Sequence, residues 1–309
     1  MLHPPRLYVY LDAVARAGSI RKAAEALHVA STALNRKILE AEEDLGTPLF
    51  ERLPRGVRPT AAGEVMLSFV RRSLSELESA ASQIEQLRGL MRGVVRLGCA
   101  ESVGTDIVPR IVAGWQARHA GVRFHLQVGG THSLMTALME DEVELVIAHD
   151  PPLPQVKLLA DMAQPLHVMM RPGHPLASRR SLRLADCQAY PVALGDVSFG
   201  SRRLLDAHIE RSRLKLHAVV ESGSVETIKA FARHGDALCF QFEAGTRRDC
   251  ALGELISIPL TDTALAGSRL QMVARAGRSL PVAALTFAET LKVSLFGGEG
   301  AGAAGSATV

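Results

Sequence analysis

The sequence predicts an α/β protein of 309 residues with three parts: an all-α N-terminal domain, a long linker helix and a two-lobed α/β domain. Up to about residue 90, apolar residues recur every three or four positions, which is the period of a helix. Beyond Gly93, short apolar runs alternate with helical patterns, and such β-α repetition is typical of sheets covered by helices. The length suffices for two or three domains, each with its own core.

The first predicted helix follows Pro4 and Pro5 and ends at Gly18, since proline is favoured at helix starts and glycine just past helix ends. Its apolar face consists of Leu7, Leu11 and Val14. We expect this face to pack behind the next two helices.

Two short helices joined by a tight turn are predicted between Ser19 and Leu45. Ser19 is placed to cap the first helix, and residues 28–30 form the turn. The second helix starts at Ser31 or Thr32. The buried stripe of the first helix is Ile20, Ala23, Ala24 and Leu27, and the inner face of the second is Leu34, Ile38, Ala41 and Leu45.

The second of these helices is asymmetric in charge. Its far end carries four acids, which phosphate groups repel, so only its first half can approach DNA. A helix-turn-helix inserts the N-terminal part of its recognition helix into the major groove. An ordinary helical hairpin with solvated charges is the alternative. The candidate DNA contacts on this helix are Ser31, Thr32, Asn35, Arg36 and Lys37.

A strand-turn-strand wing over residues 49–60 decides between these readings. It carries Arg52, Arg55 and Arg58 and has no acid after Glu51. Cations on a tight turn suit backbone phosphates, although isolated arginines are usually only solvated. With 35 Lys and Arg against 32 Asp and Glu, the net charge is only +3, so DNA affinity must come from where the charges sit. We therefore predict a winged helix-turn-helix DNA-binding domain over residues 1–60.

Residues 4–63 resemble the winged helix-turn-helix of LysR-type transcriptional regulators. This family often has Ser-Gln-Pro before the recognition helix and Ser-Arg-Gln after its first Ala-Leu, where this chain has residues 30–32 and 35–37. The resemblance implies a regulator that binds double-stranded promoter DNA, and the departures imply an unusual base sequence. The matching runs are Gly18-Ser19, Ala23-Ala24, Leu27-His28-Val29, Ala33-Leu34, Leu45-Gly46, Pro48-Leu49-Phe50-Glu51-Arg52 and Thr60-Ala61-Ala62-Gly63.

A long linker helix is predicted over residues 61–92, capped by Thr60 and running to about Leu90. Its apolar residues alternate steps of four and three, as in a coiled-coil seam. A single amphipathic helix lying on a core would show a similar stripe, but this helix is long for a globular domain. We expect a dimer, and the family resemblance implies a dimer of dimers. The seam consists of Met66, Val70, Ser73, Leu77, Ala80, Ile84, Leu87 and Met91.

The α/β domain is predicted over residues 93–296, with one lobe of about 94–161 plus 269–296 and another of 162–268. The tail over 297–309 is predicted to be disordered because it has little to bury. Predicted strands are 94–99, 122–128, 145–148, 217–221, 237–241 and 269–274, and the pattern blurs over 156–161 and 166–170. Predicted helices are 107–117, with Ile107, Ile111 and Trp115 inward, 134–142, 202–211, 225–233 and 282–296.

By the same resemblance this region is an effector-binding domain similar to periplasmic binding proteins. Residues 173–177, Glu221 with Ser222 and Ser224, and Gly235 support the match loosely. Ligands of such sheets lie at the C-terminal ends of the strands. A small-molecule effector is therefore expected in a cleft between the two lobes.

Loops that enter helices supply the candidate effector contacts, because backbone N–H groups and hydroxyls at helix N-termini bind acid groups. The same Ser and Thr residues are also common helix caps. Helix ends and Arg202 favour an anionic metabolite. The pair His132 and His149 suggests a metal sensor as an alternative, but we expect no metal and no cofactor. The candidates are Ser102, Gly104, Thr105, Gly130, Thr131, His132, His149, Phe199, Ser201, Arg202, Ser222 and Ser224.

Other classes of protein lack their usual signals in this sequence. No apolar run approaches a membrane span and no secretory signal is seen, so a cytoplasmic location is expected. A transport solute-binding protein or an enzyme on the two-lobed domain remain alternatives, yet no nucleophile elbow or phosphate loop occurs. The peroxide-sensing branch of the family would place a cysteine near Phe199, and there is none. The cysteines Cys99, Cys187, Cys239 and Cys250 are scattered and predicted to be reduced and mostly buried.

Overall fold

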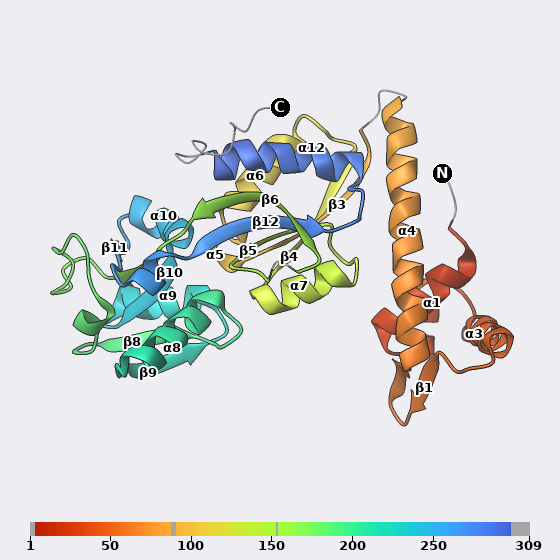
Figure 1. The fold of residues 1–309 in the computed structure, drawn as a ribbon, viewed down its shortest axis with the longest axis horizontal. Helices are drawn as coiled ribbons and strands as arrows, with labels where there is room; N and C mark the ends of the chain where they lie inside the picture. Colours follow the sequence, from red (N-terminus) through yellow and green to blue (C-terminus); the bar gives the residue numbers. More distant parts are fainter. Residues whose placement is uncertain (1–3, 88–90, 153, 298–309) are drawn as a thin grey trace, which may run out of the picture. The chain divides into compact units, whose positions relative to one another are not determined.

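A computed structural model describes residues 4–87, 91–152 and 154–297 (Figure 1). The chain divides into two compact units, Met1–Met91 with Ser279–Val282, and Arg92–Arg278 with Ala283–Val309. Nearly all of the tail that the sequence predicts to be disordered lies outside the described residues, as does the predicted continuation of the linker helix over 88–90.

The first unit is a small helical domain with a two-stranded wing. Its helices α1, α2 and α3 bury the predicted apolar faces in one core, which includes Leu11, Val14, Leu34 and Ile38. The prediction for Leu45 is wrong: its side chain is 52% exposed, because the buried row of α3 ends one turn earlier, at Ala41. The helices span Arg6–Ala17, Ile20–Ala26 and Ser31–Leu45.

The wing consists of β1 (Phe50–Leu53) and β2 (Gly56–Pro59), which pair antiparallel. Glu42 of α3 fixes its start, since Oε1 accepts hydrogen bonds from the backbone N–H of Leu49 and of Phe50 at 2.7 and 2.9 Å. Gly56 has φ +107°, and a Cβ there would lie 2.2 Å from the carbonyl oxygen of Gly18. The wing is therefore seated directly on the corner between α1 and α2.

The long helix α4 spans Ala61–Leu87, and Thr60 caps it as predicted, since its hydroxyl accepts a hydrogen bond from the N–H of Gly63 at 3.0 Å. The predicted seam is wrong at its start, where Met66 and Val70 pack in the core of their own domain. Val70 is fully buried with Leu67 in the core of the same domain, because α4 packs on α1 there. Among the described side chains of α4, the large apolar ones that are exposed are Val65, Phe69 and Ile84.

The second unit holds two five-stranded sheets, and each defines a lobe. In lobe 1 the strand order is β4-β3-β5-β12-β6. Figure 1 shows α6 and α12 on one side of this sheet and α7 on the other. The strands span Gly93–Cys99 (β3), Val122–Val128 (β4), Leu145–His149 (β5), Val156–Ala163 (β6) and Arg269–Arg275 (β12). The helices span Glu101–Gly104 (α5), Ile107–Gln116 (α6), Thr131–Met139 (α7) and Val282–Leu291 (α12), with a π-helical turn over Lys292–Phe296.

Lobe 1 departs from the prediction in four ways. Strands β3, β4 and β5 are parallel as expected, but β12 runs antiparallel to both of its neighbours. The inward row of α6 is Val108, Val112 and Trp115, so the predicted Ile107 and Ile111 are only half-buried. Helix α7 begins at Thr131, three residues before the predicted start, and the one-turn helix α5 was not predicted.

Lobe 2 has the strand order β11-β7-β10-β8-β9, with parallel pairing only among β10, β8 and β9. Strands β8 and β11 and helix α10 were missed by the sequence reading, because their apolar runs are short. The strands span Leu166–Met170 (β7), Pro191–Gly195 (β8), His217–Ser222 (β9), Leu238–Phe242 (β10) and Ile256–Pro259 (β11). The helices span Gly200–Ser212 (α8), Val225–His234 (α9), Glu243–Ala251 (α10) and Thr263–Ala266 (α11), with a 3-10 turn over Leu184–Cys187.

Within the described residues, the chain passes between the lobes after β6, at residues 164–165, and before β12, at residues 267–268. The two connections are joined, since the N–H of Gln164 donates to the carbonyl oxygen of Ser268 at 2.8 Å. A pair of adjacent connections of this kind is a hinge about which two lobes can rotate.

Candidate functional site

The first turns of α3 carry the polar side chains that the sequence assigns to DNA. Ser31, Thr32, Arg36 and Lys37 are exposed, as predicted, and Asn35 is half-buried. Ala30 precedes the helix and provides no side-chain cap, and its carbonyl oxygen accepts from the N–H groups of Ala33 and Leu34, so the N–H groups of Ser31 and Thr32 stay available. This end of α3 therefore presents donors, hydroxyls and two cations to one side.

The two cations of α3 are held by one acid. Arg36 Nε lies 3.5 Å from Glu40 Oε1, and Lys37 also bonds to the Glu40 carboxylate. The Lys37 hydrogen bond is the main reason why the pKa of Glu40 is lowered. Exposed pairs of this kind contribute little stability, so both cations can exchange Glu40 for another anion.

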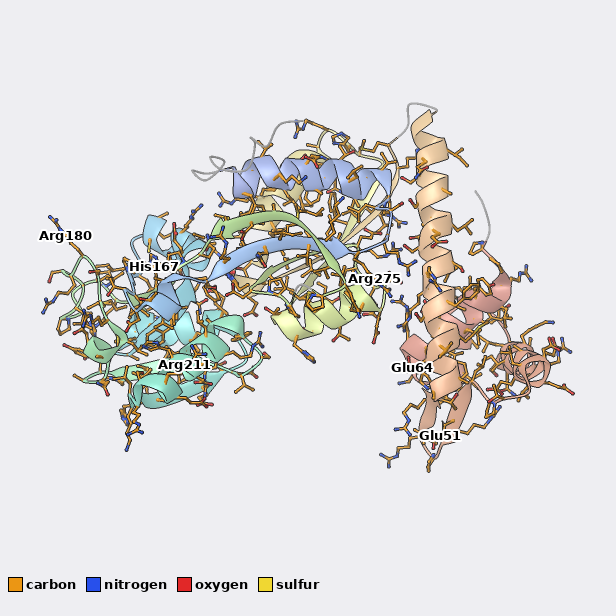
Figure 2. The ribbon with its side chains drawn as sticks, viewed as in Figure 1. Glu51, Glu64, His167, Arg180, Arg211 and Arg275 are labelled. Carbon is orange, nitrogen blue, oxygen red and sulfur yellow. The ribbon has the colours of Figure 1, made fainter. Side chains whose placement is uncertain are left out.

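The three wing arginines differ in their partners. Arg52 Nη2 donates to Asn35 Oδ1 at 2.9 Å and so ties the wing to α3. Arg58 Nη2 lies 2.7 Å from Glu51 Oε2 on the opposite strand, and Figure 2 labels Glu51. Arg55 lies in the turn between β1 and β2, is exposed, and has no ion-pair partner in the part of the chain that the structure describes. Arg52 and Arg55 therefore have no carboxylate partner among the described residues, and Arg55 has no side-chain hydrogen bond there either.

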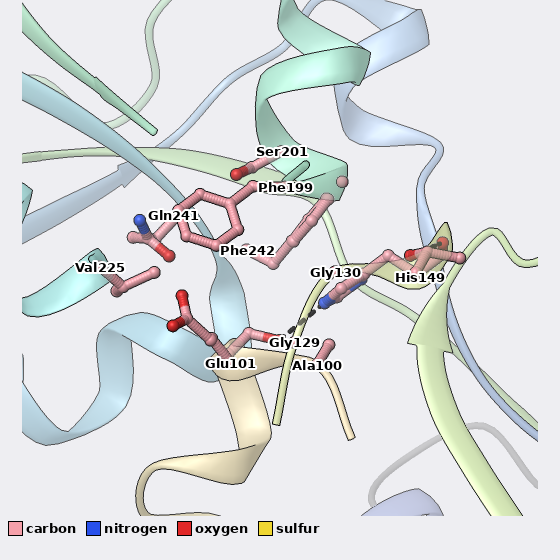
Figure 3. Close-up of a pocket in the computed structure, with 13 residues that line it drawn as sticks. Ala100, Glu101, Gly129, Gly130, His149, Phe199, Ser201, Val225, Gln241 and Phe242 are labelled. Carbon is pink, nitrogen blue, oxygen red and sulfur yellow. Dashed lines mark hydrogen bonds between the residues drawn. The ribbon is translucent and has the colours of Figure 1, made fainter. Parts of the chain in front are cut away.

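A cavity of about 30 Å³ lies between the two lobes (Figure 3). Six of the residues predicted from the sequence line it: Ser102, Gly130, Thr131, His149, Phe199 and Ser201. The sequence reading missed seven others: Ala100, Glu101, Gly129, Gly200, Val225, Gln241 and Phe242. A space of this size holds one or two waters, so the lobes are closed on each other.

Two of the residues that the sequence analysis missed satisfy the rule used to choose the others. Glu101 directly precedes the predicted Ser102, and Gln241 lies at the end of a predicted strand, so both satisfy the rule that ligands meet strand ends. From the loop after the first strand only the glycine and hydroxyl residues Ser102, Gly104 and Thr105 were candidates, which excluded Glu101, and no candidate came from the end of strand 237–241. Phe242 and Val225 are apolar, and nothing in the sequence separates them from core residues.

Five of the predicted effector residues lie away from the cavity for local reasons. Gly104 is buried against Cys99 and Val128. Thr105 donates its hydroxyl hydrogen bond to the carbonyl oxygen of Glu101, and His132 is exposed on α7. The remaining two, Ser222 and Ser224, accept hydrogen bonds from the backbone N–H groups of Ser224 and Thr227 at the start of α9.

Arg202 is also absent from the cavity lining, although the sequence reading used it as a reason for an anionic effector. Its Nε donates to Asp206 at 2.9 Å and its Nη1 to the carbonyl oxygen of Gly195 at 2.9 Å. Its Nη2 lies 3.3 Å from Glu221. The guanidinium thus holds α8 against β8 and β9 within lobe 2.

His149 connects the two lobes at the cavity. Its Nε2 and the Ser102 hydroxyl oxygen lie 2.7 Å apart, which Figure 3 marks with a dashed line. Its ring stacks on Phe242 of lobe 2 with centroids 3.5 Å apart. Burial lowers the pKa of His149 to about 3, so the imidazole is neutral. Because it is neutral, one ring nitrogen is an acceptor and the other a donor.

The approach of the lobes depends on Gly130. A Cβ at this position would lie 2.3 Å from the carbonyl oxygen of Ser198 in lobe 2. Thr131, the next residue, donates its hydroxyl hydrogen bond to the carbonyl oxygen of His149 at 3.2 Å. The N-terminal ends of α7 and α8 therefore meet across the cavity with little space for side chains.

The cysteines lie mostly in the interior, as predicted. Cys99, Cys187 and Cys239 are buried and Cys250 is exposed, and none is in a disulfide. Burial raises the pKa of each of the three buried thiols to about 12, which suppresses the reactive thiolate. Among the described residues, no group of three or more His, Cys, Asp or Glu side chains is arranged to hold a metal ion. None of the helices in the described ranges combines the length and apolarity that crossing a lipid bilayer requires.

Comparisons with known proteins agree with both parts of this architecture. The family described as "Bacterial regulatory helix-turn-helix protein, lysR family" matches residues 5–64, and "LysR substrate binding domain" matches residues 88–295. The "SDS degradation transcriptional activation protein" of a Pseudomonas strain is 33% identical over 88% of this chain and 90% of that protein. A "RuBisCO operon transcriptional regulator" of Allochromatium vinosum is 30% identical over 77% of this chain and 80% of its own length.

A solved structure extends this likeness to the fold. Full-length OxyR from Pseudomonas aeruginosa superposes with a TM-score of 0.73 at 20% identity, and the match covers 96% of this chain and 97% of that one. At this identity the likeness shows a shared fold. The family matches and the relative at 33% identity show more. The chain belongs to the LysR family of transcriptional regulators, with a winged helix-turn-helix and an effector-binding domain.

Proposed function

We propose that promoter DNA is bound by the first turns of α3 together with the wing. The observation that carries this assignment is the exposed row Ser31, Thr32 and Arg36, opposite the buried row of the same helix. Its hydroxyl and guanidinium groups are of the types that read base edges in the major groove. The wing supplies Arg55 for phosphate contact, and Arg52 orients Asn35 for base contact.

We also propose that a small molecule binds between the lobes. The cavity of about 30 Å³ is too small for a metabolite, since ligand sites usually enclose several hundred Å³. The lobes must therefore open at their two connections and close again on the effector. The effector changes DNA binding only if it favours one lobe arrangement over the other.

An acid group on the effector is supported by the helix ends at this cavity. Gly130 precedes α7 and Phe199 precedes α8, and both line the cavity with the Thr131 and Ser201 hydroxyls. Helix N-termini carry partial positive charge and free N–H groups. The helix N-termini thus favour an acid group in place of Arg202, whose guanidinium bonds to Asp206 and to the carbonyl oxygen of Gly195.

Dimerisation is proposed through the exposed apolar side chains of α4, Val65, Phe69 and Ile84. A two-fold pair would present two recognition helices to two half-sites. The family resemblance extends this proposal to a dimer of dimers.

A cytoplasmic location and the absence of enzymatic turnover complete the proposal. The relatives at 30% identity or more are transcriptional regulators. A transport solute-binding protein needs no DNA-binding unit, so the helix-turn-helix over 5–64 disfavours that alternative.

The base-reading role is tested with Arg36→Ala. We expect roughly tenfold weaker binding to the cognate operator and a relaxed base preference at the contacted position, because a guanidinium contact to a base is worth about 1–3 kcal/mol. Affinities for the operator and for single-base variants are measured by fluorescence anisotropy. Arg21→Ala is the control, since Arg21 is an exposed arginine of α2 that pairs with Glu25 as Arg36 pairs with Glu40. An unchanged base preference in Arg36→Ala would remove α3 from recognition.

The phosphate role is tested with Arg55→Ala. We expect weaker binding to every duplex and a salt slope shallower by about one, because each neutralised phosphate releases about one counterion. Arg58→Ala should change the slope less, since Glu51 already compensates that charge. The slope is read from binding constants between low and moderate salt. Equal slopes for Arg55→Ala and the parent chain would mean that the wing turn does not touch DNA.

A further inference from the structure

Asn35 of α3 and Arg52 of the wing form one polar pair on the proposed DNA-binding face. Arg52 Nη2 donates to Asn35 Oδ1 at 2.9 Å. A guanidinium carries only donors, so the oxygen of the amide, and not its nitrogen, must face Arg52. The NH2 group of Asn35 is therefore the end that is left for another partner, and no described residue bonds to it.

The fold brings the two side chains together, so their contact does not depend on one exposed hydrogen bond. Glu42 lies on the same helix as Asn35. Its Oε1 accepts hydrogen bonds from the N–H groups of Leu49 and Phe50 at 2.7 and 2.9 Å, and these fix the start of β1 against α3. Alternate residues of a strand lie on one face, so Arg52 projects on the same side of β1 as the buried Phe50.

The pair presents donors and a positive charge, because no carboxylate neutralises Arg52 among the described residues. The neighbouring Glu51 bonds to Arg58 instead, at 2.7 Å. Although Asn35 Oδ1 keeps a second lone pair, the adjacent guanidinium charge opposes the approach of another donor. A base that offers acceptors is attracted to this pair, and a base that offers a donor is repelled.

We propose that Asn35 and Arg52 together make the regulator select guanine over adenine at the base that Asn35 meets in the major groove. Guanine offers two acceptors there, N7 and O6, whereas adenine offers the acceptor N7 beside the donor N6–H2. An asparagine with a free amide reads adenine, because its oxygen accepts from N6 and its nitrogen donates to N7. Arg52 occupies the oxygen, so only the donor half of that pairing remains. This inference rests on the proposed DNA-binding face and names the base that it selects.

The test uses the full-length protein and a pool of random duplexes, so the operator need not be known beforehand. Duplexes that the parent chain enriches are sequenced. Fluorescence anisotropy then measures binding to the best duplex with each of the four bases at every position. We expect guanine to bind about tenfold tighter than adenine at one position. Asn35→Ala should reduce this ratio to less than threefold there and leave the other positions unchanged.

Variants of the wing separate the role of the pair from that of positive charge. Arg52→Ala frees Asn35 Oδ1, so the preference at the same position should change from guanine to adenine while the affinity falls. A general weakening of the wing would lower the affinity without exchanging one base for the other. Arg58→Ala is the matched control, because Arg58 is an exposed arginine of the same wing that bonds to Glu51 and not to Asn35. It should keep the guanine preference of the parent chain.

Three results would overturn the inference. They are the absence of any position that responds to Asn35→Ala, a preference of the parent chain for another base at that position, and an unchanged guanine preference in Arg52→Ala. Failure of the proposed function has a different signature, because a parent chain that enriches no duplex would overturn DNA binding itself. A parent chain that enriches duplexes but shows one of the three results loses only the base assignment.

Discussion

Gly130→Ala is expected to reduce the closed arrangement of the lobes by about a hundredfold and to abolish the effector response. The new Cβ would lie 2.3 Å from the Ser198 carbonyl oxygen, so the backbone of one lobe must move. Overpacking of this kind typically costs 1–3 kcal/mol, and its upper end of about 3 kcal/mol corresponds to that factor. Gly130 itself has φ −74° and ψ 155°, which alanine adopts readily, so lobe 1 should fold normally.

The measurement is amide hydrogen exchange at the first turns of α7 and α8, where opening exposes the N–H groups. Gly200→Ala is the matched control from the same cavity, because its Cβ would meet no atom closer than 3.6 Å. We expect the control to exchange like the parent chain and Gly130→Ala to lose protection in both turns. Parent-like protection in Gly130→Ala would show that the lobes do not meet through this contact in solution.

His149→Gln is expected to make the protein less sensitive to acid by about 2 kcal/mol between pH 7 and pH 5. Burial lowers the pKa of His149 from 6.5 to about 3 in the folded chain. Below pH 6.5 the unfolded chain therefore binds a proton that the folded chain does not. The free energy of unfolding then falls by about 1.36 kcal/mol per pH unit until the folded pKa is reached.

Urea unfolding of the full chain at the two pH values measures this difference, since the free energy of unfolding is obtained at each pH by linear extrapolation. The parent chain should lose about 2 kcal/mol more than His149→Gln over this interval. His132→Gln removes an exposed histidine of the same lobe and should behave like the parent. Equal losses in His149→Gln and the parent would mean that the imidazole is not held neutral at this cavity.

The helix-turn-helix was predictable because its determinants are local. The period of Leu34, Ile38 and Ala41 fixes which side of α3 is buried, and Arg36 then lies on the other side. The errors at Leu45 and at Val70 of the predicted seam have the same cause. An apolar stripe shows that one face of a helix is buried, but it does not show which part of the protein covers that face. Val70 is covered by its own domain rather than by a partner.

The mixture of parallel and antiparallel strand pairs in the two sheets was harder to predict from the sequence. Short strands such as β8 and β11 lack a distinctive period, and the direction of β12 depends on the path of the chain back from lobe 2. Arg202 was misassigned because a cation beside a helix start resembles a ligand group. Asp206 and Glu221, which engage it, come from the next turn and from another strand.

The sequence by itself determined the family and predicted the candidate DNA-binding residues and the loops that line the cavity, because these depend on residues a few positions apart. Only the tertiary structure decided which side chains of those loops share one cavity. Glu101 and Gln241 line one cavity, and His149 stacks on Phe242, because the two lobes close on each other. No periodicity along the chain encodes such contacts, since they depend on the closure of one lobe on the other.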